Sequence, residues 1–183
     1  MNAFREQTGV KLNITSREYF DVVDASDRVI GIAPREYIHA HNIFHRAVHV
    51  FVFNRKGEIF IQKRSLNKDT APGKWVSSCS GHVDAGEYYY EAARRELGEE
   101  ISLFNPENLS RVLVERPRPE TGFEHVHLFR CFSDAISKLH PLEISQGRWI
   151  QPENLTRWIS ERPYDFAGSF IYLWGRYSEN VFS

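Results

Sequence analysis

Two hydrophobic periods run along this chain of 183 residues and predict its main elements. Runs rich in β-branched and aromatic residues fill both halves of residues 45–64 and flank the turn residues Asn54 to Gly57, which predicts a hairpin. Residues 88–101 place apolar side chains at helical spacing and form the strongest predicted helix. The stripe of this helix that we expect to face the core consists of Tyr90, Ala93, Leu97 and Ile101.

Shorter segments complete the prediction. Residues 19–34 indicate two strands around a turn, 35–42 a short helix or loop, 67–75 a loop with a Pro72-Gly73 turn, and 75–81 a short strand. Strands are also predicted at residues 111–119, 125–133 and 147–150, and helices at 152–161 and 166–181. The order lacks regular βαβ alternation, so we expect an α+β fold rather than a doubly wound sheet. Residues 1–18 are expected to form an N-terminal arm and residues 19–183 a single domain.

Composition and charge narrow the function classes. The net charge of −1 argues against an extended nucleic-acid surface, although a local basic pocket stays compatible with it. Two cysteines indicate no disulfide framework, and the polar start of the chain lacks the apolar run of a signal peptide. The small number of cysteines makes a reducing cytoplasm the expected location. No apolar stretch approaches the roughly 20 residues of a membrane span, so we expect no membrane partner. We expect a monomer or a homodimer.

Three acids near the end of the predicted helix are an unfavourable arrangement. Glu96, Glu99 and Glu100 lie where the helix dipole prefers basic residues, and like charges three or four positions apart repel. They fall within an arc of roughly 100°, beside the stripe that should face the core. One interpretation is a solvated acidic face. The other is a divalent cation, because Mg²⁺ and Mn²⁺ take carboxylate and carbonyl oxygens and a cation turns this repulsion into attraction.

The spacing of the surrounding residues decides between these interpretations. From residue 81 the chain runs GHVDAGEYYYEAARRELGEEISL, which resembles the Nudix box at eight of its nine defined positions. The matching residues are Gly81, Glu87, Arg95, Glu96, Leu97, Glu99, Glu100 and Leu103. Ser102 stands where the family has a second glycine, at a helix end that uses left-handed backbone.

The resemblance implies a Nudix fold, in which a mixed sheet is sandwiched between helices. It also implies that the box holds Mg²⁺ or Mn²⁺ and that water cleaves a diphosphate linked to another group. Glu99 and Glu100 then correspond to metal ligands, Glu96 to a ligand or a general base, and the Gly81 carbonyl to a further ligand. The remaining catalytic pair, Arg95 and Glu87, corresponds to a brace between the box loop and its helix.

A longer resemblance, over about residues 20–180, is to isopentenyl-diphosphate isomerases, a branch of the same superfamily. Those enzymes carry a cysteine for proton transfer at the position of Ser80, whereas Cys79 lies one place earlier and, in a strand, on the other face. Their metal site is matched by His45, His82 and Glu124. Ile38 and Val126 occupy the positions of a further histidine and glutamate, and the neighbouring histidines His39, His41, His125 and His127 are out of register.

The same resemblance assigns diphosphate contacts to Arg64 and Lys68. Lys63 and Lys74 are equally well explained as exposed charges at a strand end, and Trp75 and Phe60 as core residues rather than stacking surfaces. Glu143 is a weaker candidate for a metal ligand or base.

The retained box favours a metal-dependent hydrolase that cleaves a diphosphate linkage in a nucleoside diphosphate or related compound. The alternatives are an isopentenyl-diphosphate isomerase and a non-catalytic sensor module. The small-molecule partner is therefore a diphosphate compound. The attached group stays open among nucleosides, nucleotide sugars, dinucleotides and prenyl groups.

Overall fold

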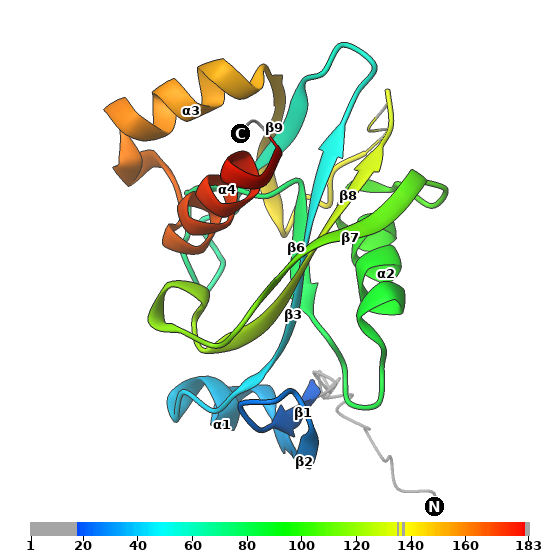
Figure 1. Ribbon diagram of the computed structural model, residues 1–183, viewed down its shortest axis with the longest axis vertical. Helices are drawn as coiled ribbons and strands as arrows, with labels where there is room; N and C mark the ends of the chain where they lie inside the picture. Colours follow the sequence, from blue (N-terminus) through cyan, green and yellow to red (C-terminus); the bar gives the residue numbers. More distant parts are fainter. Residues whose placement is uncertain (1–17, 135, 137, 182–183) are drawn as a thin grey trace, which may run out of the picture.

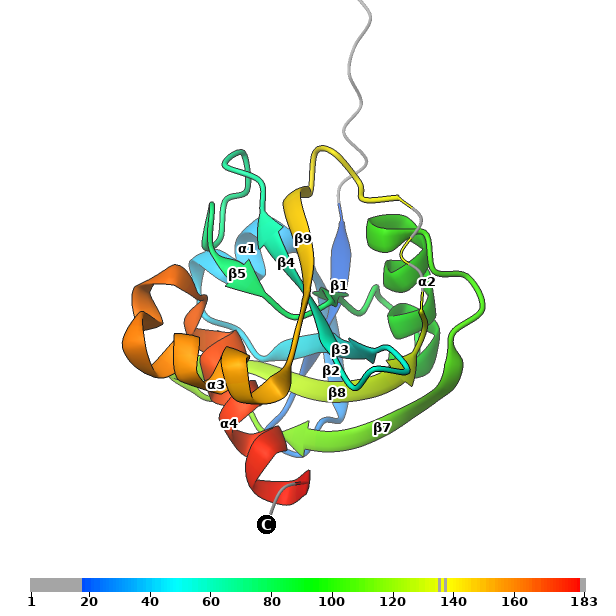
Figure 2. The same cartoon turned by 90° about the horizontal axis from the view of Figure 1, so that it is seen from above.

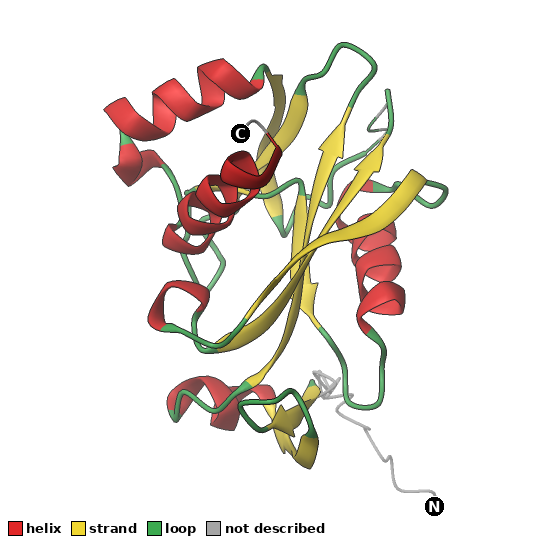
Figure 3. Ribbon diagram, viewed as in Figure 1, coloured by secondary structure: helices red, strands yellow, loops and turns green. Residues whose placement is uncertain are grey.

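The computed structural model describes residues 18–134, 136 and 138–181, and it shows a mixed sheet with helices on both faces (Figures 1 and 3). The predicted arm lies outside the described residues apart from Glu18, so the division into an arm and one domain stays a prediction. The helices are α1 (Arg35–Ala40), α2 (Tyr89–Ile101), α3 (Pro152–Glu161) and α4 (Gly168–Val181), with short 3-10 turns at Pro119–Thr121 and Pro163–Asp165. The strands are β1 (Tyr19–Val23), β2 (Val29–Pro34), β3 (His45–Phe53), β4 (Ile59–Arg64), β5 (Trp75–Val76), β6 (Cys79–His82), β7 (Glu107–Glu115), β8 (Glu124–Phe132) and β9 (Ile144–Ile150).

The central sheet confirms the expected α+β sandwich. It has seven strands, in which β3 runs parallel to β8 and the other pairings are antiparallel. Figure 2 shows α2 on one side of the sheet and α3 and α4 on the other. One apolar core lies between the sheet and α2, and another between the sheet and the two C-terminal helices. The strands β1 and β2 form a separate two-stranded sheet.

The predicted hairpin has its turn and both strands, but the strands separate immediately. β3 and β4 share only the Phe53–Ile59 pair beside the turn. Beyond it β3 pairs with β6 and, over its whole length, with β8, while β4 pairs with β5 and β9. Pairing with distant segments therefore displaces the local hairpin partner, and the two separated strands both contribute to the pocket described below.

The single strand predicted at residues 75–81 is wrong, because β5 and β6 pair with different neighbours. β5 lies beside β4, whereas β6 lies beside β3. Between them Ser78 is fully buried, and its Oγ donates to the Phe60 carbonyl and accepts from the Val52 amide at 2.8 Å. These bonds satisfy backbone groups where the chain crosses between the two strands.

Two further boundaries and one helix face differ from the prediction. β7 begins at Glu107 and ends before Pro117, which cannot donate to a ladder, and β9 begins at Ile144 rather than residue 147. On α2 the predicted stripe is confirmed at Ala93, Leu97 and Ile101, which are buried, and is wrong at Tyr90, which is 46% exposed. The helix ends at Ser102 in the left-handed conformation (φ 55°), so serine takes the role that glycine has in the motif.

No helix within the described part of the chain is long and apolar enough to cross a membrane.

Candidate active site

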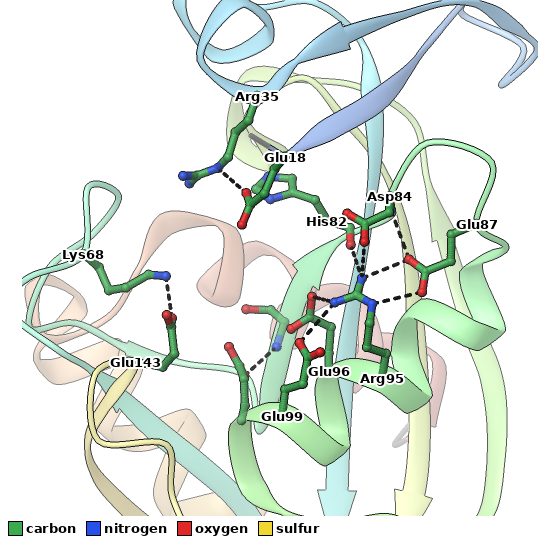
Figure 4. A network of polar contacts seen from close by, with 12 residues as sticks. Glu18, Arg35, Lys68, His82, Asp84, Glu87, Arg95, Glu96, Glu99 and Glu143 are labelled. Carbon is green, nitrogen blue, oxygen red and sulfur yellow. Dashed lines mark hydrogen bonds and ion pairs between the residues drawn. The ribbon is translucent and has the colours of Figure 1, made fainter. Parts of the chain in front are cut away.

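The acids of α2 and the basic residues of the loop after β4 face one pocket of about 590 Å³. The pocket lies where β3 and β4 have separated, and residues of β6, α1 and α2 also line it. Figure 4 shows Glu96, Glu99 and Arg95 on one side of this space, and Lys68 paired with Glu143 on another. The structure therefore brings the predicted acidic and basic groups to the same space.

Glu100 is the most deeply buried of the three acids, with 6% of its surface exposed. Its Oε2 accepts from Gln62 Nε2 at 2.7 Å and from the Ser80 amide at 3.3 Å, which fixes the carboxylate. Burial raises the pKa of Glu100 despite these hydrogen bonds. Gln62 is a positioning residue that the sequence prediction missed, because nothing in the sequence marks a strand glutamine as the partner of a helix 38 residues away.

Glu96, like Glu100, is mostly buried, in surroundings that disfavour its charged form. Only 13% of its side chain is exposed, and burial, followed by repulsion from Glu100, raises the pKa of Glu96 to about 8. Glu99 differs, since 61% of its side chain is exposed at the mouth of the site. Of the three acids beside the core-facing stripe, Glu96 and Glu100 are therefore shielded from water and Glu99 is not.

Arg95 joins the box loop to the helix. Its Nε donates to Glu87 Oε1 at 3.0 Å and its Nη2 to Glu87 Oε2 at 2.9 Å, which makes a bidentate pair. The same guanidinium donates to the His82 carbonyl at 3.0 Å and to Glu96 Oε1 at 2.6 Å. Arg95 and Glu87 are thus in contact, as a brace between loop and helix requires, and Arg95 also offsets part of the negative charge around Glu96.

The residues present fit a hard divalent cation. A Cβ built on Gly81 would lie 2.0 Å from Glu96 Oε1, so only glycine lets the loop backbone approach this carboxylate so closely. Three carboxylates and a nearby backbone carbonyl are the oxygen donors that Mg²⁺ and Mn²⁺ prefer. Burial is the main cause of the raised pKa values of Glu96 and Glu100, and a bound cation would favour the charged form of both carboxylates.

Basic residues occupy the opposite part of the pocket. Arg64 Nε donates to the Thr70 carbonyl at 2.8 Å, and Lys68 Nζ forms an ion pair with Glu143. Arg35, at the start of α1, joins them in the lining and lies 2.9 Å from Asp69 Oδ2. No local signal connects Arg35 with residues 64–68, because their proximity depends on how α1 packs.

Four other predicted candidates lie elsewhere. Lys63 and Lys74 line a separate pocket of about 460 Å³ and do not face the acids. Trp75 and Phe60 are buried in the two apolar cores, which agrees with their interpretation as core residues.

A second cluster of potential ligands lies beside the acids. One ring nitrogen from each of His39, His45 and His82 falls within 4.8 Å of the others. Glu124 Oε1 lies 3.2 Å from His82 Nε2 and 3.5 Å from His45 Nε2. Although burial alone raises the pKa of Glu124, the nearby His45 ring and the contact with His82 hold the pKa of this carboxyl well below its usual range. Imidazoles with one carboxylate suit a borderline metal such as Zn²⁺.

This cluster corrects the prediction for His39. The sequence places Ile38 at a ligand position of the isomerases and His39 out of register with it, yet the His39 ring joins the cluster. Ile38 is fully buried against Phe20, and the next residue on the short helix, His39, turns toward His45 and His82. The position matched by resemblance missed this, because His39 lies on α1 and a turn separates it from His45 on β3. The other three neighbouring histidines named in the sequence analysis lie outside the cluster. His41 contacts Tyr37, His125 contacts Asp24, and His127 stacks on Tyr89.

The geometry of His45 supports a ligand role for the cluster. Its Nδ1 lies 2.8 Å from the Ile43 carbonyl, so this nitrogen carries the proton and Nε2 is left as an acceptor. Nε2 is buried without a hydrogen-bond partner among the described residues, and it is directed at the carboxylate of Glu124. Two acceptors facing each other are unfavourable unless a proton or a cation lies between them.

Comparisons with known proteins agree with the fold and the box. The model of the NUDIX domain matches residues 43–167. An isopentenyl-diphosphate Delta-isomerase of Burkholderia multivorans is 34% identical over 151 residues, which cover 80% of this chain and 85% of that protein. An uncharacterized Nudix hydrolase of Yersinia pestis is 34% identical over 148 residues, 76% of each chain. The crystal structure of DR0079 from Deinococcus radiodurans has a TM-score of 0.68 at 30% identity, and covers 79% of this chain and 90% of its own.

Proposed function

This chain belongs to the NUDIX domain family, and from that membership we propose that it is a metal-dependent hydrolase of a nucleoside diphosphate linked to another group. At the level of class, it is a Nudix hydrolase acting on phosphorus-containing anhydrides. The metal, the diphosphate linkage and the residue roles are the proposed part. A cytoplasmic location and a monomeric or homodimeric state stay predictions.

One observation carries the proposal: the carboxylates of Glu96 and Glu100 and the basic groups of Arg64 and Lys68 line the same pocket. A diphosphate needs both, since its oxygens bind guanidinium and ammonium groups and also share a divalent cation with carboxylates. When bound, Mg²⁺ or Mn²⁺ supplies neutralisation of phosphate charge and activation of water.

The side chains divide the work as follows. Glu99 and Glu100, with the Gly81 carbonyl, would hold the cation, and Gln62 keeps the Glu100 carboxylate in place. Glu96 would serve as a further ligand or as the base that takes a proton from water.

The basic side chains and the brace complete the site. Arg64 and Lys68 orient the diphosphate. Arg95, held by Glu87, fixes the box loop against α2. Glu143 accompanies Lys68 and stays the weaker candidate for a ligand or base.

Isomerisation of isopentenyl diphosphate is the second candidate, favoured by the His39, His45 and His82 cluster and by the similarity to the Burkholderia enzyme. Ser80 argues against it, because it lines the pocket at the position of the proton-transferring cysteine, and a hydroxyl is a much weaker acid than a thiol. Cys79 is fully buried in the core beside α2 and does not replace it.

Turnover of a panel of diphosphate compounds, followed by phosphorus NMR, tests the proposal. Nucleoside diphosphates, nucleotide sugars, dinucleotides and prenyl diphosphates are incubated with Mg²⁺ or Mn²⁺, and in parallel with a chelator. We expect cleavage of at least one nucleoside diphosphate compound with metal only. Absence of turnover throughout favours the non-catalytic sensor, and conversion of isopentenyl to dimethylallyl diphosphate without cleavage favours the isomerase.

A further inference from the structure

An imidazole interrupts the apolar face of β3 inside the pocket. Residues 47, 49, 51 and 53 project toward the side of the sheet covered by α4, and Phe51 and Phe53 belong to that core. His49 stands between Ala47 and Phe51, is 7% exposed and lines the pocket. Neither the metal ligands nor the diphosphate contacts account for it.

A buried hydroxyl fixes the orientation of this ring. His49 Nδ1 lies 2.7 Å from Oγ of Ser77, which is itself fully buried. Nδ1 is therefore directed into the protein. Nε2 has no hydrogen-bond partner within the described residues, so it is the ring nitrogen available to a ligand. Burial lowers the pKa of His49 to about 4, so the ring is neutral near pH 7 and offers a hydrogen bond without a charge.

The lining of the pocket that contains His49 includes serine hydroxyls and small apolar side chains as well as the charged groups already described. The direct partner of His49 in the β3–β6 ladder is Ser80, and Ser169 at the start of α4 lines the same pocket. The apolar lining residues near the edge strand β5 are small, namely Ala71, Val76 and Ala167. The Ala167 amide bonds the Trp75 carbonyl at 3.0 Å, which holds this end of α4 beside β5.

These contacts select among the groups that a diphosphate can carry. A prenyl chain would leave the buried imidazole of His49 without a partner for its free nitrogen, which is unfavourable. A nucleobase would require an aromatic surface for stacking, and in the described lining Phe20 is already packed against His45 and His82. Small side chains interspersed with hydrogen-bonding groups suit a group with several hydroxyls.

We propose that His49 is a specificity-determining residue whose Nε2 hydrogen-bonds a hydroxyl of the group attached to the diphosphate, and that this group is a sugar. Ser77 is the positioning residue that holds the ring. The inference rests on the proposed hydrolase function, because it names the part of the substrate that the acids and basic groups leave undefined.

Paired ligands test the inference. UDP-glucose and ADP-ribose are each compared with the methyl ester of the same nucleoside diphosphate, which lacks the sugar. Wild type should prefer the sugar compounds at least tenfold in kcat/KM. His49→Phe should lose about tenfold of this preference through KM, while the methyl esters change little, because one uncharged hydrogen bond is removed. His49→Gln should retain most of the preference for sugar compounds, and Ser77→Ala should lose about threefold of this preference.

Binding measured by calorimetry with a chelator present keeps the inference separate from catalysis. The preference for sugar compounds should appear in Kd and fall in His49→Phe, with melting temperatures reporting whether each variant folds. Equal loss for sugar and methyl compounds, or no loss for either, would overturn the role of His49. Binding with the expected preference but no turnover with any metal would overturn the hydrolase proposal and leave the sugar site standing.

Discussion

Replacing Glu96 by glutamine should abolish a proton release that accompanies metal binding. Burial and the neighbouring Glu100 raise the pKa of Glu96 from its ordinary 4.5 to about 8. At pH 7 such a group is protonated in roughly 0.9 of the metal-free molecules. Since a carboxylate must lose its proton to bind a cation, Mg²⁺ binding at pH 7 should release about 0.9 proton from this side chain. Metal affinity should accordingly rise with pH up to about pH 8.

The same shift has a consequence for folding. The folded state holds the Glu96 proton more tightly than the unfolded state, so between pH 4.5 and about 8 the free energy of unfolding falls as pH rises. The slope approaches about 1.4 kcal/mol per pH unit in the middle of this window. In metal-free protein the loss between pH 5 and pH 8 is therefore on the order of a few kcal/mol, and each kcal/mol lowers the melting temperature by about 2–4 °C.

Calorimetry in buffers of different ionisation enthalpy measures the released protons, and urea unfolding at pH 5, 6.5 and 8 with a chelator measures the stability. Glu96→Gln should release about one proton fewer and show a flatter stability profile. Glu91→Gln is the matched control, because Glu91 is an exposed acid on the same helix. Equal proton release from wild type and Glu96→Gln, or a wild-type stability that does not change over this range, would refute the reasoning.

Three further outcomes follow from the site. Glu100→Gln should lower kcat at least 100-fold with saturating Mg²⁺. It should also raise the metal-free melting temperature by about 2–4 °C, because the charge of a buried carboxylate is removed. Unchanged kinetics and unchanged calorimetric melts would place Glu100 outside the metal site. Substitution of either basic residue, as Lys68→Met or Arg64→Lys, should raise KM about tenfold with little change in kcat, because the ammonium or the forked guanidinium is lost. Steady-state kinetics in which kcat falls and KM does not change would contradict their role in substrate binding. Neither wild type nor Ser80→Cys should isomerise isopentenyl diphosphate by proton NMR, because Val126 leaves the position of the isomerase glutamate apolar; interconversion well above background would reverse this conclusion.

The sequence predicted those elements whose signals are local. The turn at Gly57 and the extent of α2 depend on neighbouring residues, and both were confirmed. The pairing of β3 with β8 was not predictable, because it joins segments about 80 residues apart through a parallel register that no turn specifies. The division of residues 75–81 into two strands was missed because it depends on the pairing of β5 with β4 and of β6 with β3, which no local signal specifies.

In the candidate site, too, the local features were predicted from the sequence and the contacts between distant segments were not. The box spacing identified Glu96, Glu99 and Glu100 because one helix turn brings them together. Contacts between distant segments, such as Gln62 with Glu100, need the fold. His39 is an intermediate case. It lies only six positions before His45, but the end of α1 and the following turn decide which way its ring points.

The central claim is that water attacks a phosphorus atom of a bound diphosphate at the box carboxylates. Hydrolysis of the best compound of the panel in oxygen-18 water, with Mg²⁺ and phosphorus NMR, tests it most directly. We predict one oxygen-18 in one phosphate product per turnover, and loss of that signal with a chelator or in Glu100→Gln. Products labelled only in the non-phosphate fragment, or label incorporated equally by Glu100→Gln, would contradict the claim.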